Sequence, residues 1–238
     1  MPRIAIEVGS LLFPTKSAAV AHFKVILHAH PVGERIPEPY ATELDWLLDR
    51  HPEVEQKRGA GVVGFRTMTG LYGTKCFVID RVDESSTDFS YLSCVDGKAP
   101  TPQQEIIQAM RAEVRGDIQD AKRRHFAAHA DAEGRVACAI TGDRVAIEEC
   151  HADHAPPRTF STLALAFLKA RRIVPDRSQV TAPADNQMEP RLLDRALASD
   201  WREFHREMAA IRIVTRRANM ERNAEAKVRK KDRQLILG

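Results

Sequence analysis

The stretch EECHADHAPPRTF, residues 148–160, gathers a cysteine, two histidines, an aspartate and two prolines into one short segment. Such a cluster adds little to stability, so it is either a metal-dependent catalytic strand, a zinc site or a polar surface loop. If the segment is a strand, alternate side chains share a face. His151 and Asp153 then point to one side and His154 to the other, and Pro156-Pro157 ends the strand.

The surrounding sequence predicts the partners of this strand. RVACAITGDRVAIEECHADH, residues 135–154, has the composition of a β-hairpin with its turn at residues 141–143. Much later IRIVT, residues 211–215, is typical of a short strand, and RRANMERN, residues 216–223, begins a basic helix. Two amphipathic helices, STLALAFLKARR and DWREFHREMAA, are expected in the long insertion between them.

An Asp-His pair at a strand end, followed by a second strand and a helix bearing an asparagine, resembles the HNH, or ββα-metal, nuclease motif. The resemblance covers roughly residues 135–227. It implies that His154 is the general base that activates water. It also implies that Asp153 and Asn219 bind a divalent cation, assisted by Asn223 one helical turn later.

The implied chemistry is phosphodiester hydrolysis, most naturally of DNA. A neutral imidazole can take a proton from water near pH 7. A carboxylate, an amide oxygen and waters suit Mg²⁺, Mn²⁺ or another hard divalent cation. Guanidinium groups can bind flanking phosphates. The candidate phosphate contacts are Arg158, Arg212, Arg216, Arg217 and Arg222.

The sequence departs from the motif at two places. The middle Asn of the HNH family aligns with Ala210, so its orienting role is either vacant or filled by another residue. His205 is the candidate replacement and is therefore a further candidate catalytic residue. The zinc positions of many members read Cys138/Thr141 and Thr215/Ala218. No structural zinc is therefore expected. His151 is either a third metal ligand or a packing residue.

The first part of the chain indicates a small α+β domain. Helices are expected in SAAVAHFKVILHAH, residues 17–30, and in ATELDWLLDRHP, where Thr42 is the cap and the helix stops before Pro52. An antiparallel sheet from GVVGFRTMTG, TKCFVIDRV and DFSYLSCV follows. Residues 10–96 resemble the DCL family, also described as DUF3223, in His51-Pro52, Lys57, Cys76-Phe77 and Asp88–Tyr91. The association of that family with nucleic-acid machinery suggests a recognition module by analogy.

The expected organisation is an α+β chain in three parts. Residues 8–97 form the DCL-like domain with its antiparallel sheet. Residues 98–131 form a linker and a connecting helix, which Thr101 caps and which runs to about Ala130. Residues 132–238 form the HNH-like nuclease module with its helical insertion and basic C-terminal helix.

Composition and charge restrict the class of protein to which this chain can belong. Of the 238 residues 43% are hydrophobic and 29% charged, and no apolar run could span a bilayer. Without a signal peptide or a CxxC pair, a cytosolic protein with reduced cysteines is expected. Eleven Lys/Arg against five Asp/Glu from Trp201 onward give that end a net charge of +6, against −3 for the rest.

The basic end is either a nucleic-acid contact or a solvated helix. An endonuclease is the leading interpretation, and a homodimer is one expected assembly for a double-strand cut. A nucleic-acid-binding protein, perhaps RNA-directed, with a degenerate ββα module is the alternative. A protein-interaction module with an incidental basic tail is the third.

Overall fold

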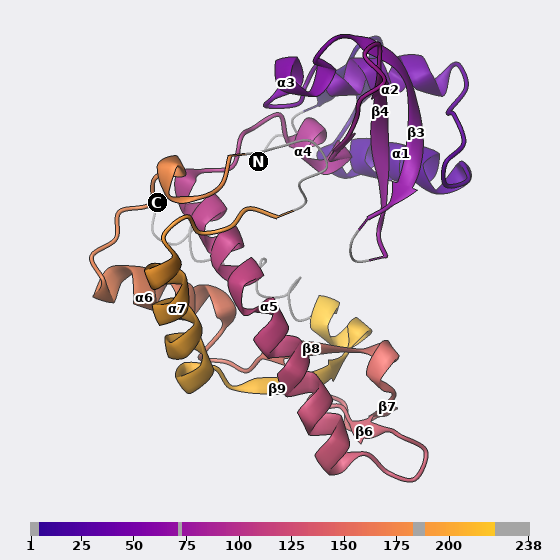
Figure 1. Ribbon diagram of the computed structural model, residues 1–238. Helices are drawn as coiled ribbons and strands as arrows, with labels where there is room; N and C mark the ends of the chain where they lie inside the picture. Colours follow the sequence, from indigo (N-terminus) through magenta and orange to yellow (C-terminus); the bar gives the residue numbers. More distant parts are fainter. Residues whose placement is uncertain (1–4, 71–72, 183–188, 222–238) are drawn as a thin grey trace. The chain divides into compact units, whose positions relative to one another are not determined.

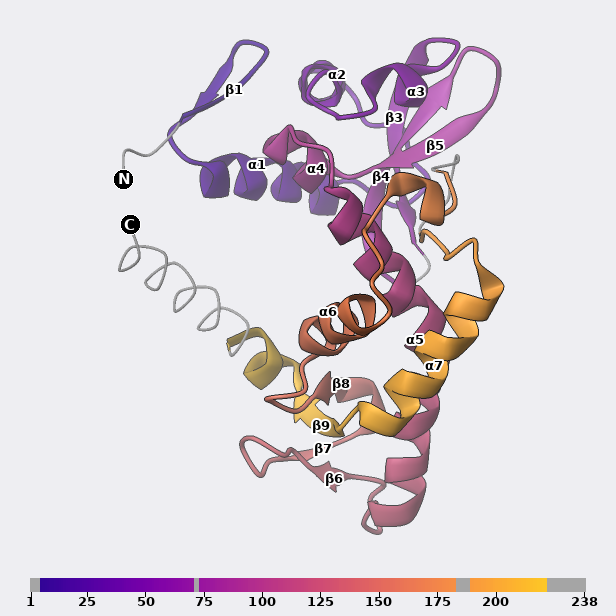
Figure 2. The same cartoon turned by 90° about the vertical axis from the view of Figure 1, so that its left-hand side faces the viewer.

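The structure is a computed structural model that describes residues 5–70, 73–182 and 189–221. The chain divides into two compact units, one within Met1–Thr101 and the other within Pro102–Thr181 and Glu189–Gly238. Figures 1 and 2 show the elements of each unit from two sides. Helices and small antiparallel sheets occur in both, which agrees with the expected α+β class. Among the described residues, no helix is both long and apolar enough to cross a bilayer.

The first unit opens with a hairpin of β1 (Ile6–Val8) and β2 (Leu11–Phe13), which the sequence analysis missed. Three helices and an antiparallel sheet of order β3-β4-β5 follow. The helices are α1 (Lys16–Ala29), α2 (Tyr40–Leu48) and α3 (Val54–Arg58). The strands are β3 (Val62–Thr69), β4 (Lys75–Arg81) and β5 (Ser86–Phe89).

Two details of the first unit correct the sequence analysis. DFSYLSCV is not one strand, because β5 ends at Phe89 and α4 (Tyr91–Asp96) begins after Ser90, whose hydroxyl caps that helix by accepting from the Ser93 amide. Thr42 is not the cap of α2, which begins at Tyr40. Its amide and hydroxyl instead donate to the Glu38 carboxylate at 3.1 and 2.7 Å.

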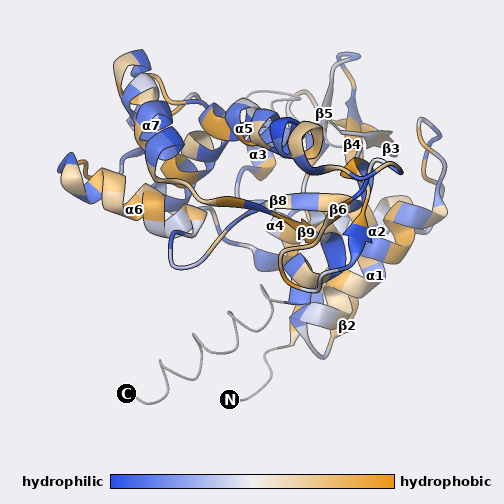
Figure 3. Cartoon of the chain, turned by 90° about the horizontal axis from the view of Figure 1, so that it is seen from below, coloured by the Kyte–Doolittle hydropathy of each residue, from blue (hydrophilic) through white to orange (hydrophobic). Residues whose placement is uncertain are grey.

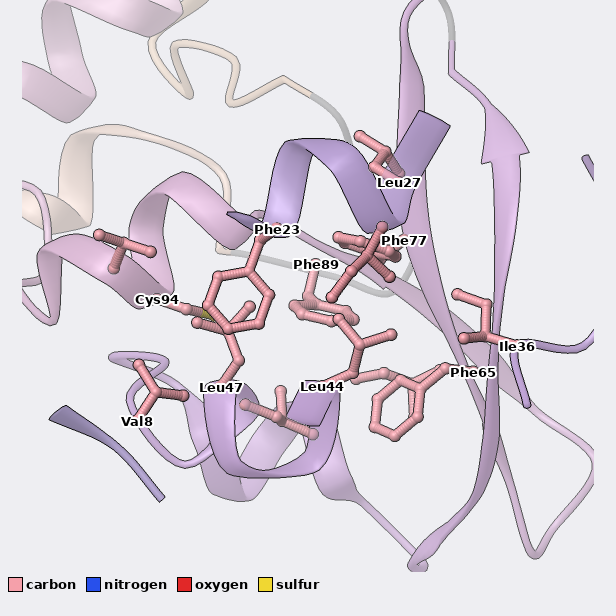
Figure 4. Close-up of a cluster of buried hydrophobic side chains, with 14 of the residues drawn as sticks. Val8, Phe23, Leu27, Ile36, Leu44, Leu47, Phe65, Phe77, Phe89 and Cys94 are labelled. Carbon is pink, nitrogen blue, oxygen red and sulfur yellow. The ribbon is translucent and has the colours of Figure 1, made fainter. Parts of the chain in front are cut away.

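Aromatic and aliphatic side chains from the sheet and the helices form the core of the first unit (Figure 4). Phe77 and Phe89 stack on neighbouring strands with ring centroids 5.6 Å apart. Burial of such rings is the main stabilising contribution in a unit of this size. The central residues are Phe23, Leu44, Leu47, Phe65, Phe77, Ile79 and Phe89.

The second unit is organised around the 28-residue helix α5 (Pro102–His129), which confirms the predicted helix. The helices of the insertion, α6 (Phe160–Ala170) and α7 (Arg195–Met208), pack on its first half. Figure 3 shows both hydrophilic and hydrophobic residues on α7, whereas α6 is mostly hydrophobic. Trp201 is fully buried in their core and donates from Nε1 to the Met110 carbonyl at 2.8 Å.

The predicted hairpin of residues 135–154 is divided in the structure. β6 (Val136–Ala137) and β7 (Arg144–Val145) form a short hairpin, and a 3₁₀ turn, η1 (Ile147–Glu149), separates it from β8 (Cys150–His154). β8 pairs instead with β9 (Ile211–Thr215). A further 3₁₀ turn, η2 (Arg177–Gln179), lies in the insertion.

Candidate ββα site

β8 and β9 form an antiparallel pair, and a helix over residues 216–221 follows β9 at once (Figure 1). Cys150 is opposite Thr215, and His154 is opposite Ile211. The Thr215 hydroxyl accepts from the Ala218 amide at 3.1 Å and so caps the helix. Two antiparallel strands and a helix are the arrangement that the sequence predicted for this region.

β8 presents its polar side chains on two faces. Cys150 and His154 are buried, whereas His151 is exposed and Asp153 is partly buried. This alternation follows from the two-residue repeat of a strand. His151 and Asp153 therefore share one face, as predicted, and His154 points to the other.

Asn219, from the helix over residues 216–221, contacts the exposed face of β8. Its side-chain nitrogen lies 3.1 Å from His151 Nδ1. Its Oδ1 is a buried oxygen that, within the described part of the chain, accepts no hydrogen bond. A buried oxygen without a donor is costly unless something else satisfies it, so Asn219 Oδ1 is suited to a cation. Burial, and then the charges of Arg216 and Lys122, lower the pKa of His151, which favours its neutral form.

Asp153 is held by an arginine of the opposite strand. Arg212 Nε and Nη2 both lie 3.0 Å from the same carboxylate oxygen, and the Asp153 side chain is only 11% exposed. Asp153 is thus ion-paired and shares the His151 face. The ion pair also means that Arg212, a predicted phosphate contact, already has a carboxylate partner.

His154 and His205 meet in the interior of the second unit. Their Nε2 atoms are 2.8 Å apart, and the side chains pack against Phe160 and Trp201. His154 is 7% exposed and His205 3%. Burial, followed by the charge of Arg111, lowers the pKa of His154 to about 4. Burial and the neighbouring His154 lower that of His205 to about 4. The structure thus brings both predicted catalytic histidines together as a neutral pair.

His205 also reaches a cavity of about 300 Å³ between α5, α7 and β9. The cavity has both charged and apolar side chains on its walls. The charged residues around it are Asp117, Asp120, Arg124 and Arg206. Asp117 pairs with Arg202 and Arg206 of α7.

The remaining predicted phosphate contacts are distributed over this unit. Arg158 donates to the Met208 carbonyl at 3.3 Å, and Arg217 pairs with Glu221 at 2.7 Å. Arg216 donates to the Glu148 carbonyl. Arg222 and Asn223 lie outside the described residues. Lys122 of α5 was not predicted, yet its ammonium donates to the Cys150 carbonyl at 2.8 Å.

Three of the four positions aligned with the zinc ligands of the HNH motif lie close together, and one of them is a cysteine. The Cys138 sulfur accepts from the backbone amides of Thr141 at 3.5 Å and Thr215 at 3.3 Å. Burial alone would raise the pKa of this thiol, but hydrogen bonds from the Thr141 side chain and from the backbone of Thr141, Ile140 and Thr215 bring it to about 7. Cys138 thus contacts Thr141 and Thr215, and Thr215 in turn caps the helix that carries Ala218.

The donor set on the His151 face fits a hard cation with few protein ligands. Across the residues that the structure describes, no three His, Cys, Asp or Glu side chains converge as a metal cluster. Asp153 and Asn219 would supply a carboxylate and an amide oxygen, and His151 could add an imidazole nitrogen. Magnesium sites in enzymes commonly use one or two protein oxygens, with waters and substrate phosphate completing the shell.

Part of the first unit matches a known protein family. Residues 24–95 match the family model described as "Protein of unknown function (DUF3223)". The first unit therefore carries a DUF3223 domain, and for this part of the chain the resemblance to the DCL family is confirmed.

Curated relatives include plant proteins that share only part of their length with this chain. Protein EMBRYO DEFECTIVE 514 of Arabidopsis thaliana is 30% identical over 41% of this chain and 50% of its own. Protein DCL, chloroplastic, of Solanum lycopersicum is 35% identical over a region that covers 33% of this chain and 37% of that protein. DNA-directed RNA polymerase IV subunit 1 of Arabidopsis thaliana is 36% identical over a region that covers 31% of this chain and 5% of that protein. The chain thus covers half or less of each of these relatives.

A solved structure is also similar to this chain. It is the solution NMR structure of an uncharacterized protein from Rhodospirillum rubrum, with 35% sequence identity and a TM-score of 0.36. The similarity covers 40% of this chain and 88% of that one.

Proposed function

We propose that the second unit is a metal-dependent endonuclease of the ββα type, which hydrolyses phosphodiester bonds in DNA. The observation that carries this proposal is the position of Asn219. It extends from the helix after β9 to the face of β8 that bears Asp153, and its buried Oδ1 accepts no hydrogen bond within the described residues. A buried amide oxygen and a carboxylate that approach the same face of a strand are the kinds of ligand that a cation site needs.

Asp153 and Asn219 would hold the cation, Mg²⁺ or Mn²⁺, with His151 as a further donor on the same face. A cation bound there would neutralise charge on the scissile phosphate. Arg212 holds the Asp153 carboxylate through two nitrogens, which fixes the orientation of that ligand. Asn223, which lies outside the described residues, stays a predicted assisting ligand.

His154 takes the role of general base. In this role, Nε2–H of His154 donates to His205 Nε2, which leaves the lone pair of Nδ1 to accept a proton from water. The water oxygen attacks phosphorus, the bond to the leaving oxygen breaks, and a proton from solvent completes the alcohol. His205 thus acts as a positioning residue that selects the tautomer of His154, the role that Ala210 cannot fill.

Plasmid cleavage tests this function directly. Supercoiled DNA incubated with the parent protein and Mg²⁺ or Mn²⁺ should be nicked or linearised, and EDTA should prevent cleavage. His154→Ala, Asp153→Ala and Asn219→Ala should each reduce the rate at least about 100-fold. His129→Ala, an exposed histidine of α5, is the matched control and should cleave at the parental rate. An intact parental substrate under all these conditions would refute cleavage.

A second candidate is a nucleic-acid-binding protein whose ββα module does not cut. The burial of His154 favours it, because a base must touch water and this imidazole is only 7% exposed. One relative of the first unit is a subunit of a DNA-directed RNA polymerase, which is compatible with nucleic acid as partner under either candidate. DNA or RNA binding that His154→Ala leaves unchanged, without cleavage by the parent, would favour this candidate.

A further inference from the structure

Three segments of the second unit meet around the peptide bond between Cys150 and His151. From α5, the Lys122 ammonium donates to the Cys150 carbonyl at 2.8 Å. From the helix over residues 216–221, Arg216 donates to the Glu148 carbonyl and Asn219 contacts His151. Two cations from different helices therefore lie beside the His151 face of β8.

These two cations differ from their neighbours in how they are paired. Arg212, Arg217 and Arg123 each have a carboxylate partner, in Asp153, Glu221 and Asp120. Within the described residues, Lys122 and Arg216 instead bind backbone carbonyl oxygens, which carry no net charge. No carboxylate of the described residues therefore pairs with either positive charge. A lysine ammonium has three donors, so Lys122 keeps donor capacity beyond its contacts with the Cys150 carbonyl and side chain.

We propose that Lys122 and Arg216 form the phosphate-binding site of the β8 face, where they hold the nucleic-acid backbone beside His151 and Asn219. This site rests on the endonuclease function proposed above and specifies how its substrate is held. The ligand is a phosphodiester, because two cations with free donors match phosphate oxygens. Arg216 is exposed and Lys122 partly buried, so both can be reached from solvent.

Four variants distinguish a specific phosphate-binding role of Lys122 and Arg216 from a general effect of lost positive charge. Lys122→Gln removes the charge but keeps an amide that can still donate to the Cys150 carbonyl. Arg216→Gln removes the second cation. Arg123→Gln is the matched control, since it lies next to Lys122 on α5 but is neutralised by Asp120. Lys122→Arg retains the charge and should restore the parental behaviour.

Binding is measured by fluorescence anisotropy of a labelled DNA duplex in EDTA at several salt concentrations, so that cleavage does not enter. A plot of log affinity against log salt has a negative slope. Each of Lys122→Gln and Arg216→Gln should make this slope shallower by about 0.9. Affinity at 0.1 M salt should fall roughly tenfold. The control and Lys122→Arg should keep the parental slope. Single-stranded DNA and RNA of the same sequence identify the preferred backbone.

The outcomes separate this site from the endonuclease itself. If the parent binds but cuts nothing and the two glutamine variants lose binding, the phosphate site stands and the endonuclease does not. If the parent cuts DNA and Lys122→Gln matches Arg123→Gln in slope, affinity and rate, the phosphate site is overturned. Absence of binding to any of the three probes also overturns it. Thermal unfolding of each variant verifies that it is folded.

Discussion

His154 and His205, 51 residues apart in sequence, meet through their Nε2 atoms at 2.8 Å inside the second unit. Two neutral imidazoles can share one such hydrogen bond only if one carries hydrogen on Nε2 and the other does not. Each therefore fixes the tautomer of the other. The hydrogen bond joins β8 to α7. The predicted general base, His154, therefore contacts the helical insertion that stabilises this unit.

Removal of one histidine should leave the other buried without its partner. His205→Leu is expected to cost about 1–3 kcal/mol in the free energy of unfolding, because His154 Nε2 loses its hydrogen bond. His154→Leu/His205→Leu should cost less than the sum of the two single variants, since the residues act as a unit. Urea unfolding of the three variants measures this, with His129→Leu as an exposed control. Strict additivity would show that the pair does not couple.

Acid should destabilise both units. The pKa values of His51 in the first unit and of His154 and His205 in the second are lowered to about 4, from 6.5 in an unfolded chain. Folding therefore favours the neutral imidazoles, so their contribution is complete above pH 6.5 and is lost as the pH falls from 6.5 towards 4. The loss should be on the order of a few kcal/mol.

Urea unfolding at pH 7.5 and pH 4.5 measures that loss. In His154→Leu/His205→Leu the second unit should show a flatter pH dependence, while the first unit, which retains His51, should keep its own. An unchanged pH profile in the double variant would contradict the assignment to this pair.

Gly9 should tolerate no side chain. Its φ is +56°, and an added Cβ would lie 2.1 Å from the Trp46 ring. Gly33 also has positive φ, at +88°, but nothing lies within 4 Å of an added Cβ. Gly33→Ala therefore measures the backbone strain alone, about 1 kcal/mol. Gly9→Ala should cost at least about 2 kcal/mol more, because the indole must move. Equal costs in thermal or urea unfolding would refute the contact.

A zinc site should be recoverable at the corner that Cys138 occupies. The Cys138 sulfur already accepts from the amides of Thr141 and Thr215, and its pKa of about 7 favours the thiolate that zinc binds. The variant Thr141→Cys/Thr215→Cys/Ala218→Cys should bind one Zn²⁺ per chain, measured by elemental analysis after dialysis. Adding Cys138→Ser should weaken it strongly. A folded triple variant that retains no zinc would show that the four positions are not close enough.

Local sequence patterns predicted much of the secondary structure. Helical spacing of apolar residues located α1 and α5, and strand composition located β3, β4 and β9. The error at residues 88–95 arose because FSYLSCV has a strand-like composition, whereas the Ser90 hydroxyl caps a helix there. A cap one residue after a strand outweighed the propensity of the residues that follow.

The sequence by itself determined which residue types lie on each face of β8, because a strand alternates its side chains. Only the tertiary structure decided what those faces contact. The pairing of β8 with β9 places Arg212 on Asp153, the packing of α7 brings His205 to His154, and α5 brings Lys122 to Cys150. These contacts join residues far apart in the chain, so they depend on how the helices of the second unit pack around α5, which no local pattern specifies.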